Sequence, residues 1–167
     1  MNLTPIPGFE GLYSITESGM VFSHAKGKFR ALSMGSTYFQ VTLNKGGKKS
    51  SWSIHRLMSR TFFGGAMLDH KDRNPLNNNK ANLRPCTHQQ NIFNCRKRSD
   101  NTSGLRGVSW SKERKKWHAQ ITFNGKCVAL GRYETRNEAA EAYNLKAKEL
   151  FGEFAVLNTY DEVAQTA

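Results

Sequence analysis

Residues 68–91 read LDHKDRNPLNNNKANLRPCTHQQN, a run in which an adjacent Asp-His pair precedes a series of asparagines. Two interpretations fit this run. It is a surface loop rich in turn-forming residues, because Asp, Asn and Pro all favour turns. Alternatively, it is a metal site that cuts phosphodiester bonds. The first interpretation needs only a loop, whereas the second needs a fold that brings the Asp-His pair close to a later asparagine.

Phosphodiester cleavage has two requirements that these residue types can meet. It needs a base for the attacking water and a cation near the scissile phosphate. Histidine suits the first task because its ordinary pKa leaves it largely neutral at physiological pH. Asp and Asn suit the second task because a hard divalent cation prefers oxygen ligands. Asp69 and His70 are consecutive in an extended segment, so their side chains point to opposite sides and can divide the two tasks.

A helix is predicted from Pro85 to about Arg98. Residues three apart share one face of a helix, so His88, Asn91 and Asn94 or Cys95 lie on a common face. We expect this face to close over the strand that carries the Asp-His pair, with Asn91 as the second metal ligand.

The spacing of these residues resembles the HNH (ββα-metal) endonuclease motif, most of all that of the phage homing endonucleases. Asn82 follows His70 by twelve residues, and Asn91 follows Asp69 by twenty-two. The resemblance implies that His70 is the general base and that Asp69 and Asn91 hold a divalent cation, Mg²⁺ or Mn²⁺. It also implies that Asn82 pins the central loop. His88 is an alternative source for the last His of the motif.

The first 54 residues are predicted to form a small β-rich, DNA-contacting module. PIPGFEGLYSITESGMVFS (residues 5–23) is similar to a module that often precedes such nuclease cores, and SIHRLMSRTF (residues 53–62) to the helix that joins the two. In YFQVTLNKGGKKSSWSI (residues 38–54), alternating apolar residues flank Asn44-Lys45-Gly46-Gly47, which predicts a hairpin. A short helix over 55–63 is then expected to cap that sheet with Leu57 and Met58.

The C-terminal region predicts three strands and one helix. RGVSWS, KWHAQITF and KCVALGRY are the strands, and Asn124-Gly125 is the turn between the second and third. Thr135 and Glu138 fit a capping box that opens the helix. Trp117, Ala119, Ile121 and Phe123 share one face of the middle strand, and His118, Gln120 and Thr122 share the other. Trp110 and Trp117 are expected to pack in the core.

Residues 104–157 resemble the Apetala-two type DNA-binding domain of plant transcription factors, through GVSW, KWHAQI, LGRYET, EAAEAYN and FGEFAVLN. The resemblance implies DNA contacts from the sheet at Arg106, Ser109, Ser111, Arg114, Gln120, Thr122 and Arg132. Several of these are shorter or less basic than the family's residues, which implies weaker base readout. In addition, Lys116 is expected to contact the DNA backbone, as are Arg96 and Arg98 before the domain.

The whole chain is therefore expected to have an α+β fold. Its predicted parts are the N-terminal module at 1–54, the nuclease core at 55–98, a polar linker at 99–105, the DNA-binding domain at 106–157 and a tail at 158–167. The sequence has 167 residues, a formal net charge of +12 and a pI near 9.9, which favours a polyanionic partner such as duplex DNA.

Composition also narrows the setting. No apolar run is long enough to span a membrane, and three cysteines without a C-x-x-C pair suggest neither a disulfide framework nor a cysteine zinc site. We expect a monomer or weak dimer in the cytoplasm of a bacterial host cell, with no membrane partner and no small-molecule cofactor. The alternative to a nuclease is a non-catalytic DNA-binding regulator. RNA binding is disfavoured because the sheet lacks the aromatic ribonucleoprotein motifs.

Overall fold

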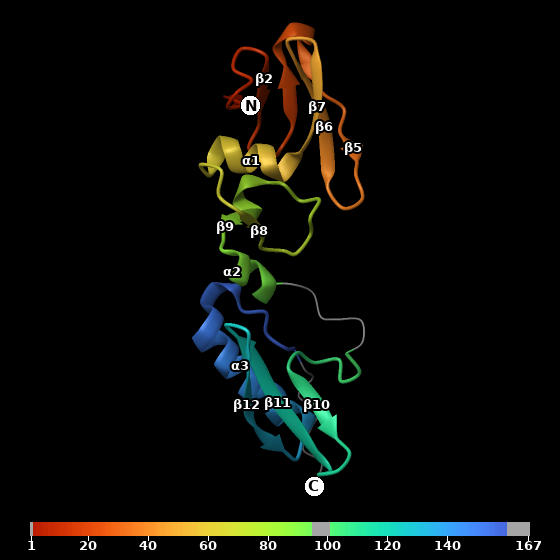
Figure 1. Cartoon of the computed structure of the whole chain (residues 1–167), viewed down its shortest axis with the longest axis vertical. Coiled ribbons are helices and arrows are strands. Elements are labelled where there is room, and N and C mark those ends of the chain that lie inside the picture. The colour runs from red at the N-terminus through yellow and green to blue at the C-terminus, as the bar shows by residue number, and fades with distance from the viewer. Residues whose placement is uncertain (1, 95–100, 160–167) are drawn as a thin grey trace. The chain divides into compact units, whose positions relative to one another are not determined.

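A computed structural model of the chain describes residues 2–94 and 101–159 (Figure 1). The chain forms two compact units, Met1–Asn91 and Ile92–Ala167. The described elements are several small antiparallel sheets and few helices, so the predicted α+β class is confirmed. Within the described ranges, no helix is both long and apolar enough to cross a membrane.

The first unit begins with two small antiparallel sheets. One has the order β1-β2-β3-β4, and the other has the order β5-β6-β7. The strands are β1 (Thr4–Pro5), β2 (Tyr13–Ile15), β3 (Val21–Ser23), β4 (Lys28–Phe29), β5 (Ser33–Met34), β6 (Phe39–Lys45) and β7 (Lys48–Ser53), and a 3₁₀ turn, η1 (His24–Lys26), follows β3.

The β6–β7 hairpin forms where its sequence pattern predicted it. Val41 and Leu43 are buried and Thr42 is exposed, as the period of two requires. Gly46 and Gly47 make the turn, both with positive φ (58° and 79°), the combination that a tight two-residue hairpin demands. Helix α1 (Ile54–Phe62) follows directly.

One hydrophobic core serves the whole first unit. Leu57 and Met58 of α1 are fully buried, as predicted, and Leu83 from the nuclease motif belongs to the same cluster. The cluster comprises Ile6, Phe9, Tyr13, Ile15, Val21, Val41, Leu43, Ile54, Leu57, Met58 and Leu83. The N-terminal sheets and the nuclease motif are therefore packed together, although the sequence placed a boundary between them at 54/55.

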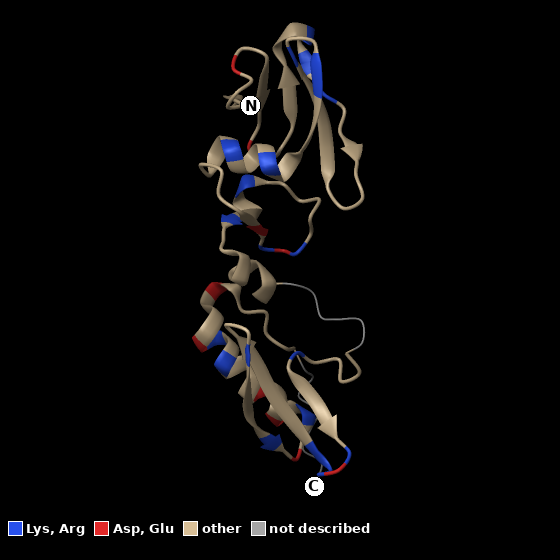
Figure 2. Cartoon of the chain, viewed as in Figure 1, with Lys and Arg blue, Asp and Glu red and all other residues tan. Residues whose placement is uncertain are grey.

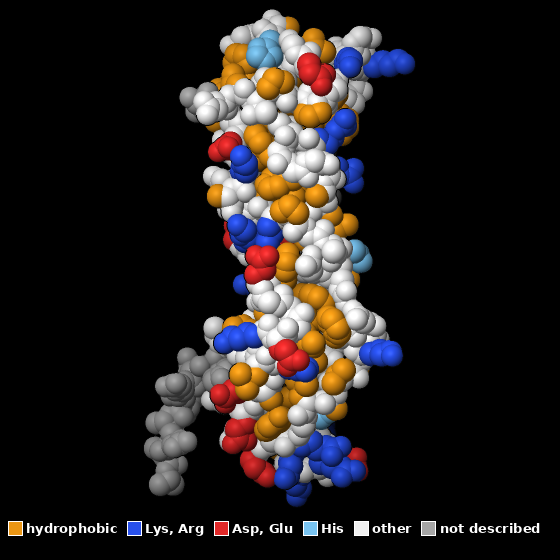
Figure 3. Space-filling model, turned by 90° about the vertical axis from the view of Figure 1, so that its left-hand side faces the viewer, with side chains coloured by type: hydrophobic (Ala, Val, Ile, Leu, Met, Phe, Trp, Pro, Cys, Tyr) orange, Lys and Arg blue, Asp and Glu red, His pale blue; other side chains and the backbone are white. Residues whose placement is uncertain are grey.

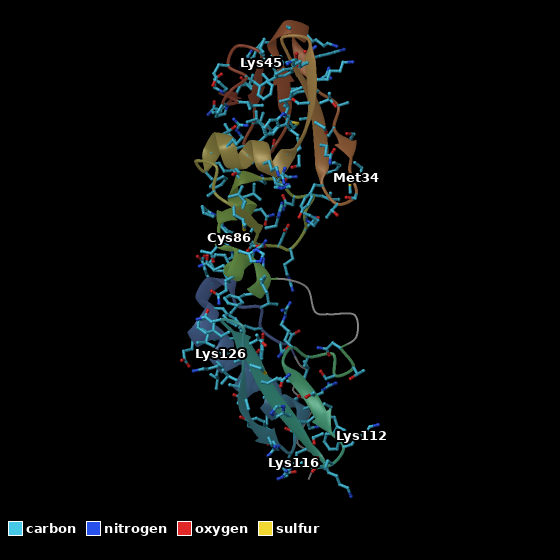
Figure 4. All side chains as sticks on the ribbon, in the orientation of Figure 1. Met34, Lys45, Cys86, Lys112, Lys116 and Lys126 are labelled. Atoms are coloured by element: carbon cyan, nitrogen blue, oxygen red, sulfur yellow. The ribbon has the colours of Figure 1, made fainter. Side chains whose placement is uncertain are left out.

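The nuclease motif forms two short strands and a helix. Strands β8 (Leu68–His70) and β9 (Leu83–Pro85) pair antiparallel, with the 3₁₀ helix η2 (Lys80–Asn82) just before β9. Cys86 continues the pairing, because its N–H donates to the carbonyl of Met67 at 2.9 Å, and it lies where the chain leaves β9 (Figure 4). Helix α2 (His88–Phe93) completes the ββα arrangement.

The predicted start of this helix at Pro85 is wrong. Pro85 is the last residue of β9, and α2 begins at His88. A reciprocal cap explains the shift: the Thr87 N–H donates to Gln90 Oε1 at 2.8 Å, and the Gln90 N–H donates to Thr87 Oγ1 at 3.2 Å. The sequence signal was present, because T-x-x-Q is a capping-box pattern. The predicted end near Arg98 lies outside the described residues.

The second unit is a three-stranded antiparallel sheet of order β10-β11-β12 with one helix packed on it (Figure 1). The elements are β10 (Val108–Ser111), β11 (Lys116–Phe123), β12 (Lys126–Tyr133), α3 (Arg136–Phe151) and the 3₁₀ turn η3 (Gly152–Phe154). The Thr135–Glu138 capping box and the Asn124-Gly125 turn are both confirmed. Ala139 and Ala140 of α3 pack on Val108 and Ala119, because small side chains allow close approach to the sheet.

One residue from each of the two predicted boundary segments is buried in this unit. Leu105, at the end of the predicted linker, is 4% exposed and belongs to the core. Asn158, at the start of the predicted tail, is 7% exposed. Its side chain accepts from the Arg106 N–H at 2.6 Å and donates to the Arg106 carbonyl at 3.0 Å. The Asn158 side chain therefore links the segment after η3 to the segment just before β10.

Candidate active site

Asp69 is buried at the centre of β8 and paired with an arginine. It is 4% exposed, and Arg84 lies directly across from it on β9. Oδ2 of Asp69 accepts from Nε of Arg84 at 3.0 Å and from Nη2 at 2.8 Å. Two bonds from one planar guanidinium converge on Oδ2 of Asp69, so this oxygen has a defined position.

His70 ends β8 and is half-buried among aromatic rings. Its ring lies 6.5 Å from the Tyr38 ring, nearly parallel to it, and 6.4 Å from the His55 ring, edge-on. Nε2 of His70 lies 3.4 Å from Oδ1 of Asn78. The imidazole is therefore contacted from the β5–β6 loop, from α1 and from the loop after β8.

His55 itself is a neutral neighbour of His70. Burial is the main cause that lowers its pKa to about 4, and the nearby His70 and Arg56 charges lower it further. Its Nδ1 is buried without a hydrogen-bond partner. At neutral pH, His55 thus contributes a ring surface to the site and no charge.

Asn82 joins both ends of the loop between β8 and β9. Its Nδ2 donates to Oδ1 of Asp72 at 2.9 Å and to the carbonyl of Asn77 at 2.8 Å, and its Oδ1 accepts from the Asp72 N–H at 3.1 Å. Burial alone would raise the pKa of Asp72, but hydrogen bonds from Asn74, Asn77 and Asn82 lower it overall. This geometry suits a loop-pinning role for Asn82, and nothing in it gives Asn82 a chemical step.

His88 and Asn91 both lie on α2. His88 is its first residue and is exposed, whereas Asn91 is half-buried and belongs to the same compact unit as Asp69. Within residues 2–94 and 101–159, no group of three or more His, Cys, Asp or Glu side chains could hold a metal ion. Asp69 and Asn91 would offer a carboxylate and an amide oxygen, which fit a cation such as Mg²⁺ that keeps water and phosphate oxygens among its ligands.

The open face of the second unit's sheet collects most of the predicted DNA-contacting residues. Ser109 pairs with His118, which pairs with Arg132, and Ser111 pairs with Lys116, so these side chains form rows across the strands. Gln120 and Thr122 are exposed on the same strand as His118. A β-bulge after Ala119 shifts the register with β12. His118 occupies the middle of a row and was not among the predicted contacts.

The turn between β10 and β11 adds positive charge. Lys112, Arg114 and Lys115 are exposed there. Figure 2 marks Lys and Arg positions along the ribbon at this end of the unit, and Figure 3 shows basic side chains gathered there. Figure 4 labels Lys112 and Lys116 beside the same turn. Lys116 also forms a surface ion pair with Glu134 at 2.7 Å.

The structure does not bring Arg106 to the open face. Nε and Nη2 of Arg106 are buried without partners, and its guanidinium lies against Tyr143 of α3. Burial raises the pKa of Tyr143, although the Arg106 charge opposes that rise. Trp110 also departs from expectation: it is 47% exposed because it lies on the edge strand, packed edge-on against Trp117, and only Trp117 packs on the core. Arg96 and Arg98 lie outside the described residues.

Four residues near the candidate site were missed by sequence reasoning: Tyr38, His55, Asn78 and Arg84. For Arg84, a signal existed, because pairing LDH with LRP as a hairpin sets Arg84 opposite Asp69. No local signal separates Asn78 from its neighbours Asn77 and Asn79, since burial of the middle asparagine depends on tertiary packing.

Comparison with known families gives two matches. Residues 53–92 match the HNH endonuclease family, and residues 1–44 match the NUMOD4 motif. The two matches together cover both parts of the first unit. Neither reaches the sheet and helix of the second unit.

Several viral proteins are similar to this chain. An uncharacterized HNH endonuclease of Acanthamoeba polyphaga mimivirus is 38% identical over 113 residues, 65% of this chain and 58% of that protein. Protein 3.8 of Escherichia phage T7 is 40% identical over 91 residues, 54% of this chain and 74% of that protein. DNA endonuclease I-HmuI of Bacillus phage SP01 is 35% identical over 99 residues, 56% of this chain and 57% of that protein. The matched part thus spans little more than half of the first and third of these.

A solved structure that concerns DNA binding and cleavage by the HNH homing endonuclease I-HmuI matches this chain with a TM-score of 0.54. The two chains are 28% identical, and the match covers 84% of this chain and 82% of that one. The similarity therefore reaches beyond the nuclease motif.

Proposed function

Because the chain belongs to the HNH endonuclease family, we propose that it is a metal-dependent homing endonuclease that binds an extended duplex DNA site and hydrolyses its phosphodiester bonds. The proposal rests on the different surroundings of two consecutive residues of β8. Asp69 is buried and held by Arg84, while the next residue, His70, is held by its ring among Tyr38, His55 and Asn78.

His70 is the general base in this proposal. Its ring is half-buried, and the contacts around it limit its rotation. A positioned base of this kind contributes about 10²- to 10⁴-fold to the rate of such reactions. Asn82 acts indirectly, by holding the two ends of the loop that follows His70.

Asp69 and Asn91 are the ligands that we propose for the cation. HNH nucleases in general use a divalent metal ion, and the carboxylate and amide oxygens fit either Mg²⁺ or Mn²⁺. When bound, such a cation neutralises the charge that develops on the scissile phosphate. His88 is exposed at the start of α2 and is the alternative ligand.

We propose that the second unit is an Apetala-two type domain that reads DNA with the open face of its sheet. A β-structure of this width can enter the major groove. The proposed contacts are Ser109, Ser111, Arg114, Lys116, Gln120, Thr122 and Arg132, together with Arg96 and Arg98 on the DNA backbone. The buried guanidinium of Arg106 supports a structural role for that residue instead.

A single active site cuts one strand in each engagement. As a monomer or weak dimer, the protein would therefore nick DNA, and a double-strand break would need a second binding event. The phage relatives favour the cytoplasm of a bacterial host as the place of action.

The experiment that tests the proposal incubates the purified protein with a supercoiled plasmid that carries DNA from the phage genome, in Mg²⁺, Mn²⁺ or EDTA. We expect open-circular or linear product with metal and none in EDTA. Absence of product with either metal, together with salt-sensitive DNA binding, would favour the non-catalytic regulator instead.

The ligand assignment has its own test. Asn91→Ala is expected to raise the metal concentration required for cleavage or to abolish cleavage, because it removes one of the two proposed protein ligands. His88→Ala is the matched variant on the same helix and should leave the metal requirement unchanged. The reverse result would transfer the ligand role to His88.

A further inference from the structure

Asn78 is a buried asparagine in the loop after β8, and its hydrogen bonds determine which way its amide group points. It is 5% exposed. Its Nδ2 donates to the carbonyl of Leu76 at 3.2 Å. A carbonyl oxygen can only accept, so the amide nitrogen must face Leu76 and the amide oxygen must face the other way. That oxygen lies 3.4 Å from Nε2 of His70.

An amide oxygen, too, can only accept a hydrogen bond. We therefore propose that Asn78 is a positioning residue for His70, which it holds in the tautomer that carries its proton on Nε2. This inference rests on the proposed role of His70 as the base, and it assigns which ring nitrogen of His70 accepts the proton. Nδ1 is then the basic atom.

With Nδ1 as the base, each bond that forms in the cleavage step is matched by a bond that breaks. Nδ1 of His70 takes a proton from water, and the hydroxide oxygen forms a bond to phosphorus. The bond from phosphorus to the leaving sugar oxygen breaks, and that oxygen takes a proton from solvent. A histidine in the other tautomer carries a proton on Nδ1 and cannot accept one there, so the tautomer decides whether the base is competent.

The N-terminal sheets hold Asn78 in place. Gly19 has φ of +83°, and a Cβ atom there would lie 3.2 Å from Cβ of Asn78 and 2.9 Å from Cγ2 of Ile54. Only glycine therefore suits this close approach. Beside it, the Lys80 N–H donates to the carbonyl of Glu17 at 2.7 Å. The turn at 16–20 thus packs directly on the loop that carries Asn78.

The aromatic neighbours of His70 complete the restraint. The Tyr38 ring lies nearly parallel to the imidazole, and the His55 ring lies edge-on to it. These contacts restrict the plane of the ring but do not distinguish its two nitrogens. The distinction comes from Asn78, whose oxygen faces Nε2.

The test is NMR of the ring nitrogens of His70 in the full-length, metal-free protein, at a pH where the ring is neutral. The ¹⁵N shifts report which nitrogen carries the proton, and they need no cleavage activity. We expect wild type to show the proton on Nε2. A ring protonated mainly on Nδ1 in wild type would overturn the assignment, whether or not the protein proves to be a nuclease.

Two variants then test the cause. Asn78→Ala removes the acceptor, and Asn78→Leu removes it at nearly constant size, which guards against a collapsed loop. In both we expect a mixture of tautomers and a single-turnover cleavage rate lower by about tenfold or more, with DNA affinity unchanged. The control is Asn79→Ala, an exposed neighbour whose side chain caps η2. An unchanged tautomer in the Asn78 variants would show that Asn78 only closes the loop.

Discussion

The polar side chains of the two units differ in how far they are buried and in how they are paired. In the first unit, the candidate site is built from polar groups that are paired with one another, Asp69 with Arg84, His70 with Asn78, and Asn82 with Asp72, and all of them except Asp72 are buried or half-buried. In the second unit, Gln120, Thr122 and Arg132 stand exposed on an open sheet while the helix covers the other face. Fixed geometry suits bond cleavage, and exposed side chains that can still adapt suit DNA binding.

Loss of the Arg84 side chain should have the largest effect on stability. The side chains of Arg84 and Asp69 are only 12% and 5% exposed, so Arg84→Leu would leave a buried carboxylate without its partner. Breaking one partner of a buried pair costs about 3–5 kcal/mol. Urea unfolding followed through NMR resonances of the first unit measures this loss.

The matched control is the surface ion pair of the same unit. Lys80 and Glu17 pair at 2.7 Å, but their side chains are 40% and 62% exposed. Lys80→Ala should therefore cost no more than about 1 kcal/mol. Equal losses in the two variants would mean that burial does not set the value of the Arg84 pair.

The second unit also contains a buried polar side chain, that of Asn158, so the contrast between the two units is not complete. Asn158→Ala removes the side chain that binds both backbone groups of Arg106. Leaving two buried backbone groups unsatisfied should cost about 2–4 kcal/mol of unfolding free energy. Thr159→Ala, at an exposed neighbour, should cost almost nothing. Equal stability of both variants would show that Asn158 contributes no more than a surface residue.

His55 makes the stability of the first unit depend on pH. Its pKa is lowered to about 4 in the folded protein, against 6.5 for the ordinary side chain. Between these values the unfolded chain binds the extra proton, so stability is full above pH 6.5 and falls as the pH drops towards 4. Because the ring is only partly buried, we expect wild type to lose about 1–2 kcal/mol more than His55→Asn between pH 7 and pH 4. Parallel pH curves for the two proteins would contradict this.

On the open sheet face, single substitutions should have small effects on binding and none on folding. Arg132→Ala removes one exposed charge from a row that includes His118 and Ser109. If Arg132 contacts a phosphate, the slope of log binding constant against log salt falls by about 0.9. Arg136→Ala, exposed at the start of α3, is the control and should leave the slope unchanged.

Local patterns in the sequence predicted the elements well where one rule decided them. The β6–β7 hairpin followed from alternation and paired glycines, and α3 followed from the Thr135–Glu138 capping box. The error at α2 arose because Pro85 was interpreted as a helix start, although the T-x-x-Q cap two residues later set it. Residue spacing sufficed to select Asp69, His70, Asn82 and Asn91 as candidates, by resemblance to a known motif.

The supporting residues could not be read from spacing. Asn78 lies beside His70 in a loop against which Gly19, far away in the sequence, packs. His55 and Tyr38 reach the same ring from a helix and from the β5–β6 loop. Arg106 was expected on the DNA-reading face, yet its guanidinium is buried against Tyr143. Each of these depends on tertiary packing rather than on local pattern.

The measurement that tests the division of labour most directly compares His70→Ala with a combined Gln120→Ala, Thr122→Ala, Arg132→Ala variant on one DNA substrate. Single-turnover cleavage at saturating protein and the DNA dissociation constant are measured for both. We predict that His70→Ala lowers the cleavage rate by about 10²-fold or more and leaves affinity within about twofold, and that the combined variant does the reverse. Cleavage by His70→Ala at the wild-type rate, or a parallel loss of its DNA binding, would contradict the account.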